Sequence, residues 1–326
     1  MSSTTGSNEV TNMEVQDMTK FMMETKVEGG KSIWATTLET FGMHDGKKKK
    51  DDILCDTFEE AFNSFLDMAK NKDWQFASTP FKDFKATKED LFKAFVHWSR
   101  KSEDDETHYN PSKGFRRLEE YVKWMDNNGK GLEYNITGMK KVHDAWKSKI
   151  THDKQGRLVW WIDVGALDFK FIKTIPPNDT LSYFVWFSHL VLFDKSSQEN
   201  GFVVVESMGH AGMMESMTAI SMDVSTKLDR LTIGVLPIKM ESCIIFNNPT
   251  WIRIVMALMT PFMGKKMRKR IVMLPNKTHP QAYFDETLGK ENIPVDFAQL
   301  EGTIGKDIAE DMFDQAMSVI TDEVET

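Results

Sequence analysis

The chain has 326 residues, of which 40% are apolar and 28% are charged, with a formal net charge of -8. This composition is typical of a globular protein that can bury a sizeable core, and the acidic balance excludes general nucleic-acid binding. Two cysteines, Cys55 and Cys243, are too few for a disulfide framework. The polar N-terminus and the absence of an apolar run near the roughly 20 residues of a membrane span predict a soluble, cytoplasmic protein.

Residues 1–56 predict a flexible tail. They are rich in Ser, Thr, Gly and Met, and the lysine run 47–50 is followed by two aspartates. Such a charged, polar stretch is usually solvated and mobile.

Residues 57–150 predict a small helical bundle. Thr57 opens one helix, Thr87 with Asp90 forms a capping pattern for a second, and Pro111 opens a third. A weaker fourth helix is expected over 136–146. The apolar side chains that recur at helical spacing are Phe58, Phe62, Phe65, Leu66, Leu91, Phe92, Phe95, Trp98, Phe115, Leu118, Val122 and Met125.

Residues 151–305 predict an α/β domain, followed by an acidic C-terminal segment over 306–326. Strands are expected at 158–164, 201–205, 241–246 and 270–274, and helices at 180–193, 213–228, 251–263 and 279–288. Such alternation indicates βαβ units and a mostly parallel sheet flanked by helices. The acidic segment predicts an amphipathic helix over 308–320.

Two of these helices are apolar on nearly every side. They span 180–193 and 251–263, and the second carries only Arg253 and Thr260 as polar interruptions after its first residue. A helix of this kind must be covered all round, or it must face a cavity, a lipid or a partner. Dense core packing and a lined pocket both remain open.

An enzymatic site is not supported by the sequence. Ser207 follows a strand and precedes a helix, but a nucleophile elbow needs glycine at the position of Val205. The imaginable partners of Ser207, which nothing places near it, are His210, Asp223, Asp229 and His279. There is no Gly-rich phosphate loop and no metal-ligand spacing among the histidines. We therefore predict no catalysis, no metal and no cofactor other than a bound lipid.

Several motifs in order resemble the CRAL-TRIO family of lipid-binding and lipid-transfer proteins. They are a proline turn at 237, a strand that ends in Asn-Asn-Pro at 247–249, Pro-Phe at 261–262, and a basic stretch into the next strand. Glu206 and Gly209 match an earlier strand end, and 291–297 matches the closing motif, although Ala298-Gln299 replaces the family's two glycines. The resemblance covers about 155–305 and implies a helical bundle followed by a mostly parallel sheet, with flanking helices that enclose a lipid pocket.

Two subgroups of the family differ at charged positions. The phosphatidylinositol-transfer members carry a glutamate and a lysine where this chain has Ile238 and Thr260. The tocopherol-transfer and retinaldehyde-binding members carry basic residues that Lys239, Lys266 and Arg270 match, although a further basic position falls on Glu241. The resemblance to the second subgroup implies that the three cations contact phosphoinositide headgroups at a membrane.

The spacing of the basic residues agrees with headgroup contact. Lys266 and Arg270 are four apart, so on a helical turn they share one face. We predict that the chain binds a hydrophobic lipid and transfers it between membranes as a peripheral membrane protein, with helix 251–263 as a lid. The alternative is a lipid-sensing adaptor that recruits a protein through its tails. The expected pocket residues are Tyr183, Phe184, Phe187, Val203, Ile244, Phe246, Ile254, Leu258 and Phe262.

Overall fold

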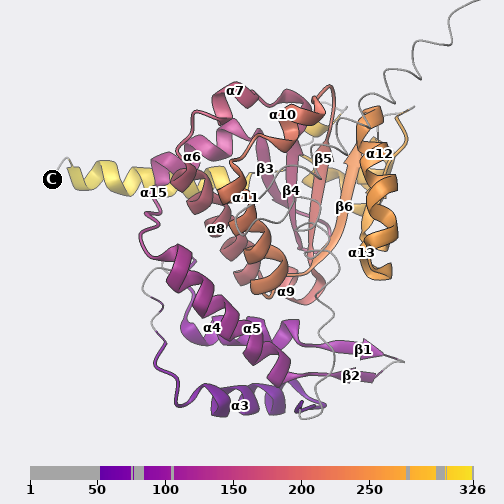
Figure 1. Ribbon diagram of the computed structural model, residues 1–326. Coiled ribbons are helices and arrows are strands. Elements are labelled where there is room, and N and C mark those ends of the chain that lie inside the picture. Colours follow the sequence, from indigo (N-terminus) through magenta and orange to yellow (C-terminus); the bar gives the residue numbers. More distant parts are fainter. Residues whose placement is uncertain are drawn as a thin grey trace, which may run out of the picture.

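The structure is a computed structural model that describes residues 52–74, 76, 84–103, 106–276, 280–298, 305 and 307–324. The helices within residues 58–124 lie below an α/β layer (Figure 1). Residues 1–51 of the predicted tail lie outside the described residues, but its last residues contact the body. Arg116 pairs with Asp52 at 2.7 Å, and Cys55 forms an antiparallel bridge with Tyr109.

The predicted helices of the N-terminal part are confirmed. They are α3 (Phe58–Ala69), α4 (Lys88–Trp98), α5 (Pro111–Trp124) with the π-helical turn η1 (Met125–Gly129), and α6 (Ile136–Ala145). Thr57 and Thr87 both form complete capping boxes, because each side chain accepts from the third residue of its helix. A hairpin of β1 (Lys101–Glu103) and β2 (Glu106–His108) was not predicted.

A five-stranded sheet forms the centre of the α/β layer, in the order β3-β4-β5-β6-β7. β3 runs antiparallel to β4, and the other neighbours are parallel, so the predicted mostly parallel α/β fold is confirmed. β3 was not predicted, because it is short and half polar. The strands are β3 (Ser148–His152), β4 (Leu158–Asp163), β5 (Phe202–Ser207), β6 (Met240–Phe246) and β7 (Ile271–Met273).

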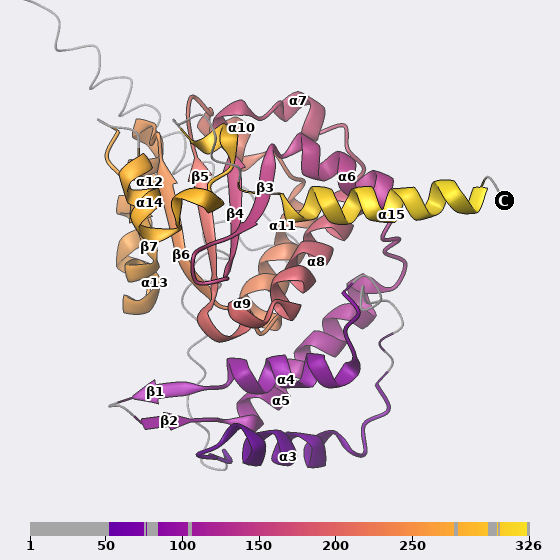
Figure 2. The same cartoon turned by 180° about the vertical axis from the view of Figure 1, so that it is seen from behind.

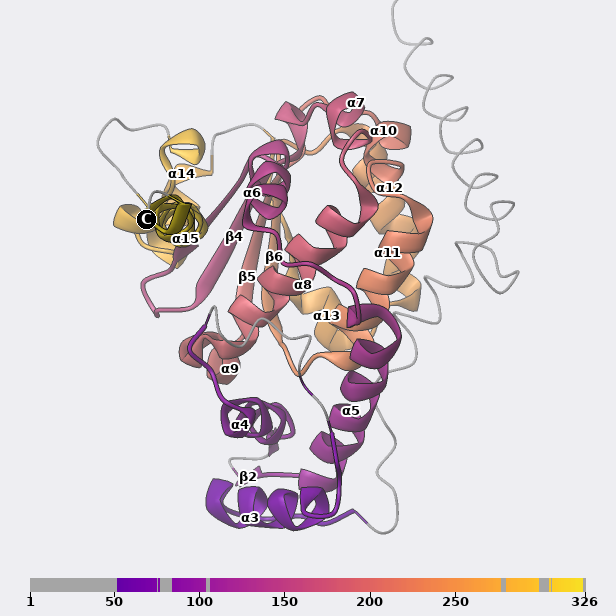
Figure 3. The same cartoon turned by 90° about the vertical axis from the view of Figure 1, so that its left-hand side faces the viewer.

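The crossovers between the parallel strands lie on one face of the sheet, as right-handed connections in sequential order require (Figure 3). In the structure, two shorter helices replace each of the predicted helices 213–228 and 251–263. From β4 to β5 the chain forms η2 (Val164–Ala166), α7 (Phe169–Ile172), α8 (Pro177–Phe193) and α9 (Lys195–Asn200). From β5 to β6 it forms α10 (Met213–Met217), α11 (Met222–Asp229) and the π-helical turn η3 (Arg230–Val235). From β6 to β7 it forms α12 (Thr250–Met259), η4 (Thr260–Phe262) and α13 (Lys265–Arg270).

The second face of the sheet is closed by the segment that follows β7. This segment contains α14 (Gln281–Thr287), η5 (Lys290–Asn292) and η6 (Val295–Phe297). It packs on alternate residues of the strands, as the two-residue period of a strand dictates. The members of this compact core are Val159, Trp161, Val203, Val205, Ile244, Phe246, Phe284, Leu288, Ile293 and Phe297.

The predicted C-terminal helix is α15 (Ile308–Val324), four residues longer than expected. Ala309 and Phe313, in its first half, are buried against the body. The rest of the helix projects away from the domain (Figure 2).

Candidate functional site

The apolar helix α8 is enclosed by the core. Every residue from Thr180 to Leu192 is buried. Phe187 packs on Trp160 of β4 with ring centroids 4.8 Å apart, and Phe184 packs on the same ring at 5.9 Å. The apolar character of α8 is therefore explained by dense packing.

Helix α12 has an equally apolar sequence but a different environment. Among its described side chains only Met259 is buried, and Ile252, Val255 and Met256 remain partly exposed. None of these residues belongs to either of the two core clusters. At its N-terminal end, Trp251 Nε1 donates a hydrogen bond to the carbonyl of Ala211 at 2.9 Å. α12 is thus an apolar helix that lies outside both core clusters.

The predicted pocket residues do not share one face of the sheet. Val203, Ile244 and Phe246 belong to the core beneath α14, whereas Tyr183, Phe184 and Phe187 of α8 lie on the opposite side. The first three therefore cannot line a cavity together with α8, since the sheet separates them. The alternation of a strand shows that two faces exist but not which elements cover each face. Ile254 of α12 is partly exposed, and the side chains of Leu258 and Phe262 lie outside the described part.

Glu206 is a half-buried acidic side chain in the apolar row of the sheet that faces α8. On this face it stands in register with Ile162 of β4 and Ile245 of β6. Burial raises the pKa of its carboxyl, and within the described ranges the carboxylate forms no hydrogen bond or ion pair. Burying an unpaired carboxylate is costly, and such groups are candidates for ligand contact. In the sequence, Glu206 stood out only as part of a family motif.

The three predicted headgroup-binding cations are brought together at the lower end of β6. Lys239 precedes β6, and Lys266 and Arg270 lie on α13. Burial and the nearby charges of Arg100, Arg270, Lys113 and Lys266 lower the pKa of Lys239 to about 8. We call these five residues the basic rim. Arg100 and Lys113 were not predicted, because they come from the N-terminal part, Arg100 just after α4 and Lys113 on α5, and are distant in sequence.

A groove of about 370 Å³ lies between α5 and η3. Trp98 forms part of its wall, and two cations lie over its ring, Lys113 Nζ at 4.5 Å and Arg117 Cζ at 4.2 Å from the centroid. The helical spacing of basic residues on α5 was the sequence feature that could have indicated this groove. The lining residues are Trp98, Lys113, Arg116, Arg117, Glu120, Arg230, Gly234 and Val235.

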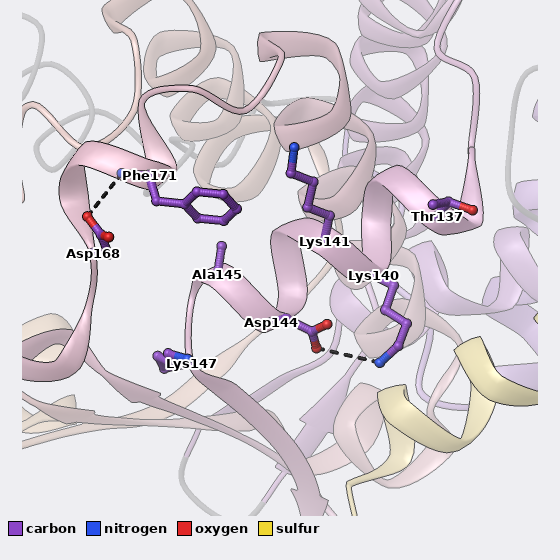
Figure 4. A pocket seen from close by; sticks show the side chains of 8 residues that line it. All are labelled: Thr137, Lys140, Lys141, Asp144, Ala145, Lys147, Asp168 and Phe171. Atoms are coloured by element: carbon purple, nitrogen blue, oxygen red, sulfur yellow. Dashed lines mark hydrogen bonds and ion pairs between the residues drawn. The ribbon is translucent and has the colours of Figure 1, made fainter.

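A second hollow, of about 540 Å³, opens between α6 and α7 (Figure 4). Lys141 Nζ lies 5.5 Å from the ring centroid of Phe171, and Lys140 pairs with Asp144 at 3.6 Å. Its lining includes none of the predicted site residues.

Within the described residues, the side chain of Ser207 forms no hydrogen bond with His210, Asp223 or Asp229. Ser207 Oγ accepts a hydrogen bond from Asn247 Nδ2 at 3.2 Å, Asp223 pairs with Lys227 at 2.7 Å, and His279 lies outside the described residues. A Ser-His-Asp arrangement does exist elsewhere. Its members are Ser148, His143 and Asp307, with Asp307 Oδ2 3.0 Å from His143 Nε2.

This arrangement is structural. Ser148, His143 and Asp307 are all buried, and Tyr183 OH lies 2.9 Å from His143 Nδ1. Asp307 also accepts from the backbone N–H groups of Ile150 and Ala309. The carboxylate therefore joins the start of α15 to β3 and α6, in a place that substrate does not reach.

In the described ranges, no group of three or more His, Cys, Asp and Glu side chains could hold a metal ion. Nor is any helix in these ranges both long and apolar enough to cross a membrane.

Comparison with known proteins finds similarity over the second part of the chain. Residues 148–298, just under half of the chain, match the family model of the CRAL/TRIO domain. The crystal structure of Sfh5 is similar over 83% of this chain and 99% of that one, at 14% sequence identity and a TM-score of 0.48. No curated protein matches the chain.

Proposed function

We propose that this CRAL/TRIO-domain protein binds a hydrophobic lipid between its sheet and α12, and that it transfers the lipid between membranes. The observation that carries the proposal is α12 itself, an apolar helix whose partly exposed Ile252, Val255 and Met256 belong to neither core cluster. Such a helix can cover a lipid when closed and contact a bilayer when displaced. Passage of a lipid through water is slow, because each exposed CH2 costs about 0.8 kcal/mol, and a closed apolar site removes that barrier.

The basic rim would hold the protein at an anionic membrane during this exchange. Each cation near an anionic membrane surface contributes about 1 kcal/mol to binding. Lys266 and Arg270 lie on the short helix α13, directly after α12 and η4. Docking at the rim would therefore bring the lid close to the bilayer.

The bound lipid would present a hydrogen-bond donor to Glu206. The carboxylate lies in an apolar row, has no partner among the described residues and has a raised pKa. A hydroxyl or amino group on an otherwise apolar ligand would satisfy it. An inositol-type headgroup inside the site is disfavoured, because neither Ile238 nor Thr260 carries a charge. Ile238 packs against the core, and Thr260 Oγ1 donates to the Met256 carbonyl.

Mass spectrometry of the lipid extracted from the purified protein tests this proposal directly. We expect one class of hydrophobic molecule with a hydroxyl or amino group. A protein that carries no lipid and also ignores vesicles containing phosphatidylinositol bisphosphate would refute the function. An adaptor would retain its lipid but fail to move it between donor and acceptor vesicles.

The role of the rim is tested by a double substitution, Lys266→Ala with Arg270→Ala. Loss of two cations removes about 2 kcal/mol of membrane attraction, so affinity for phosphoinositide vesicles should fall roughly thirty-fold while bound lipid is retained. Lys140→Ala with Lys147→Ala, in the hollow between α6 and α7, is the matched control and should change vesicle affinity little. Equal loss in both variants would contradict a specific role for the rim.

A further inference from the structure

The outer half of α15 extends beyond the domain. Ala309 and Phe313, in the first half, are buried against the body, and the helix then continues away from it to Val324 (Figure 2). At 1.5 Å per residue, the part after Phe313 is about 16 Å long. Most of the stability of a helix in a protein comes from packing of its apolar face. The outer half of α15 is therefore stabilised most if a second surface packs on it.

The apolar spacing of α15 continues where the body ends. In the sequence, Met317, Ile320 and Val324 follow Phe313 at intervals of four, three and four residues, which is the spacing of one helix face. Phe313 is the buried residue at the start of this series. The sequence thus predicts an apolar stripe along the outer half that a partner can cover.

The charge of this segment indicates the chemistry of the partner. Residues 308–326 contain six acidic residues and no Lys, Arg or His. In the first turn, Glu310 Oε2 lies 3.4 Å from Lys149 Nζ of β3. The last turn contains Asp322 and Glu323 and no basic residue, so two acids are placed at the negative end of the helix dipole. A partner that covers the outer half must therefore supply cations.

The hollow between α6 and α7 has the matching charge. Lys141 and Lys147 are exposed, and within the described ranges neither forms an ion pair with a carboxylate. The ring of Phe171 is 42% exposed and points into the hollow above Ala145 (Figure 4). Exposed aromatic rings are enriched at protein interfaces, and complementary charge selects the partner. The hollow thus suits a segment that is both apolar and acidic.

The acidic side chains of the hollow are already engaged. Asp144 Oδ1 lies 3.6 Å from Lys140 Nζ. Asp168 Oδ1 accepts from the backbone N–H groups of Lys170 and Phe171, at 3.0 Å each, as the N-terminal cap of α7. The two exposed lysines therefore remain available to an acidic partner.

The acidic helix and the basic hollow lie on the same side of the molecule (Figure 3). α15 begins against α6, where Phe313 packs on His143 with ring centroids 5.7 Å apart. From there the helix leads away from the body, and none of its described residues lines the hollow of its own chain (Figure 1). A second copy related by a two-fold axis can place its outer half across this hollow and receive the first copy's helix in return. Two identical contacts of this kind close a dimer.

We propose that the protein forms a two-fold dimer in which the outer half of each α15 packs in the α6–α7 hollow of the other copy. Asp322 and Glu323 pair with Lys141 and Lys147, and the apolar stripe covers Phe171. The contact lies at the β3 edge of the sheet, whereas α12 and α13 lie beside β6 and β7 at the other edge (Figure 1). The lid and the basic rim therefore stay open to a membrane, and the dimer does not depend on lipid binding.

Sedimentation equilibrium of the full chain tests the dimer. The mass of the wild type should approach twice the monomer mass of 37.5 kDa as the concentration rises. Lys141→Glu with Lys147→Glu turns two attractions in each of two contacts into repulsions, so dimer affinity should fall by roughly a hundredfold. The matched control reverses two exposed lysines of the N-terminal part, Lys70→Glu with Lys101→Glu, and should leave the dimer unchanged.

A charge exchange separates this contact from other modes of association. The chain with the reversed hollow and a second chain with Asp322→Lys and Glu323→Lys should each be monomeric, because like charges then meet. Mixed in equal amounts, the two chains should form a heterodimer, since both of its contacts again pair opposite charges. A chain with all four substitutions should recover the homodimer.

Three results would overturn the proposal: a wild type that stays monomeric at every concentration, a reversed hollow that leaves the dimer as strong as in the wild type, or a mixture that forms no heterodimer. If the chain with the reversed hollow does not fold, Lys141→Ala with Lys147→Ala takes its place. Dimer affinity should then fall by roughly tenfold, because the attractions are lost without added repulsion. An unchanged affinity would count against the hollow.

Discussion

Helices α8 and α12 are similarly apolar in sequence but have opposite environments. All thirteen residues from Thr180 to Leu192 of α8 are buried. Among the described side chains of α12, only Met259 is buried. The cause is their position, because α8 lies between the sheet and other helices, with Trp186 packed on Phe313 of α15 and on Phe84 at centroid distances of 4.9 and 5.7 Å. α12 lies beside β6 and the short strand β7, and none of the described elements forms a comparable layer over it (Figure 1).

The difference shows what an apolar helix reveals about function. An apolar helix sequence indicates that the helix must be shielded from water, and only the fold shows whether other parts of the protein bury it. α8 is buried by other elements of the chain and has a structural role. Within the described residues α12 is not buried in this way, and so it is the helix that we assign to the ligand and the membrane.

The largest expected effect is in α8. Trp186→Ala should lower the free energy of unfolding by about 3–5 kcal/mol, because a fully packed aromatic ring leaves a cavity. Denaturant titration measures this loss. A loss below about 1 kcal/mol would mean that α8 is as loosely packed as α12, and the comparison would fail.

The next largest effect on stability is expected at Asp307, which joins the start of α15 to α6 and β3. Burial opposes a charged Asp307, but hydrogen bonding and charge from His143, the Ile150 N–H and Lys149 keep its pKa below the ordinary 3.8. Asp307→Ala should therefore cost about 2 kcal/mol at neutral pH, since hydrogen bonds to a charged group are lost.

The pH dependence of this cost has a defined sign. A lowered carboxyl pKa stabilises the folded state above pH 3.8, and that stability is lost as the pH falls through the folded pKa. Thermal unfolding of wild type and Asp307→Ala should differ at pH 7 and converge below pH 3.8. A constant difference at all pH values would contradict a charged anchor.

A smaller effect, of opposite sign, is expected at Glu206. Its carboxyl pKa is raised by burial, so folding binds a proton and stability falls as the pH rises above the ordinary value of 4.5. Glu206→Gln should therefore be more stable than wild type at pH 7, and the gain should vanish below pH 4.5. The same variant should hold less of the native lipid, and unchanged lipid content would remove Glu206 from the site.

The smallest effect on stability is expected in α12. Met256→Ala should change the free energy of unfolding by less than about 1 kcal/mol, because the side chain is partly exposed and outside both cores. Transfer to acceptor vesicles should nevertheless slow by up to roughly tenfold, since the lid loses apolar contact at about 0.8 kcal/mol per CH2. Slowing equal to that of a substitution in α13 outside the rim, such as Met267→Ala, would contradict the role of the lid.

The sequence determined the local structure and the class of the domain. Hydrophobic periodicity, the caps at Thr57 and Thr87, and the alternation of strands and helices predicted most elements, because these signals act over a few residues. It also predicted that Lys266 and Arg270 share a helical turn, which α13 confirms.

The tertiary structure alone decided which of these elements meet. It put Val203, Ile244 and Phe246 beneath α14, left Glu206 on the other face without a partner among the described residues, and brought Arg100 and Lys113 to the rim. These placements depend on which elements cover each side of the sheet and on contacts between residues more than a hundred positions apart. No local pattern encodes them, since an apolar residue is equally well buried on either face.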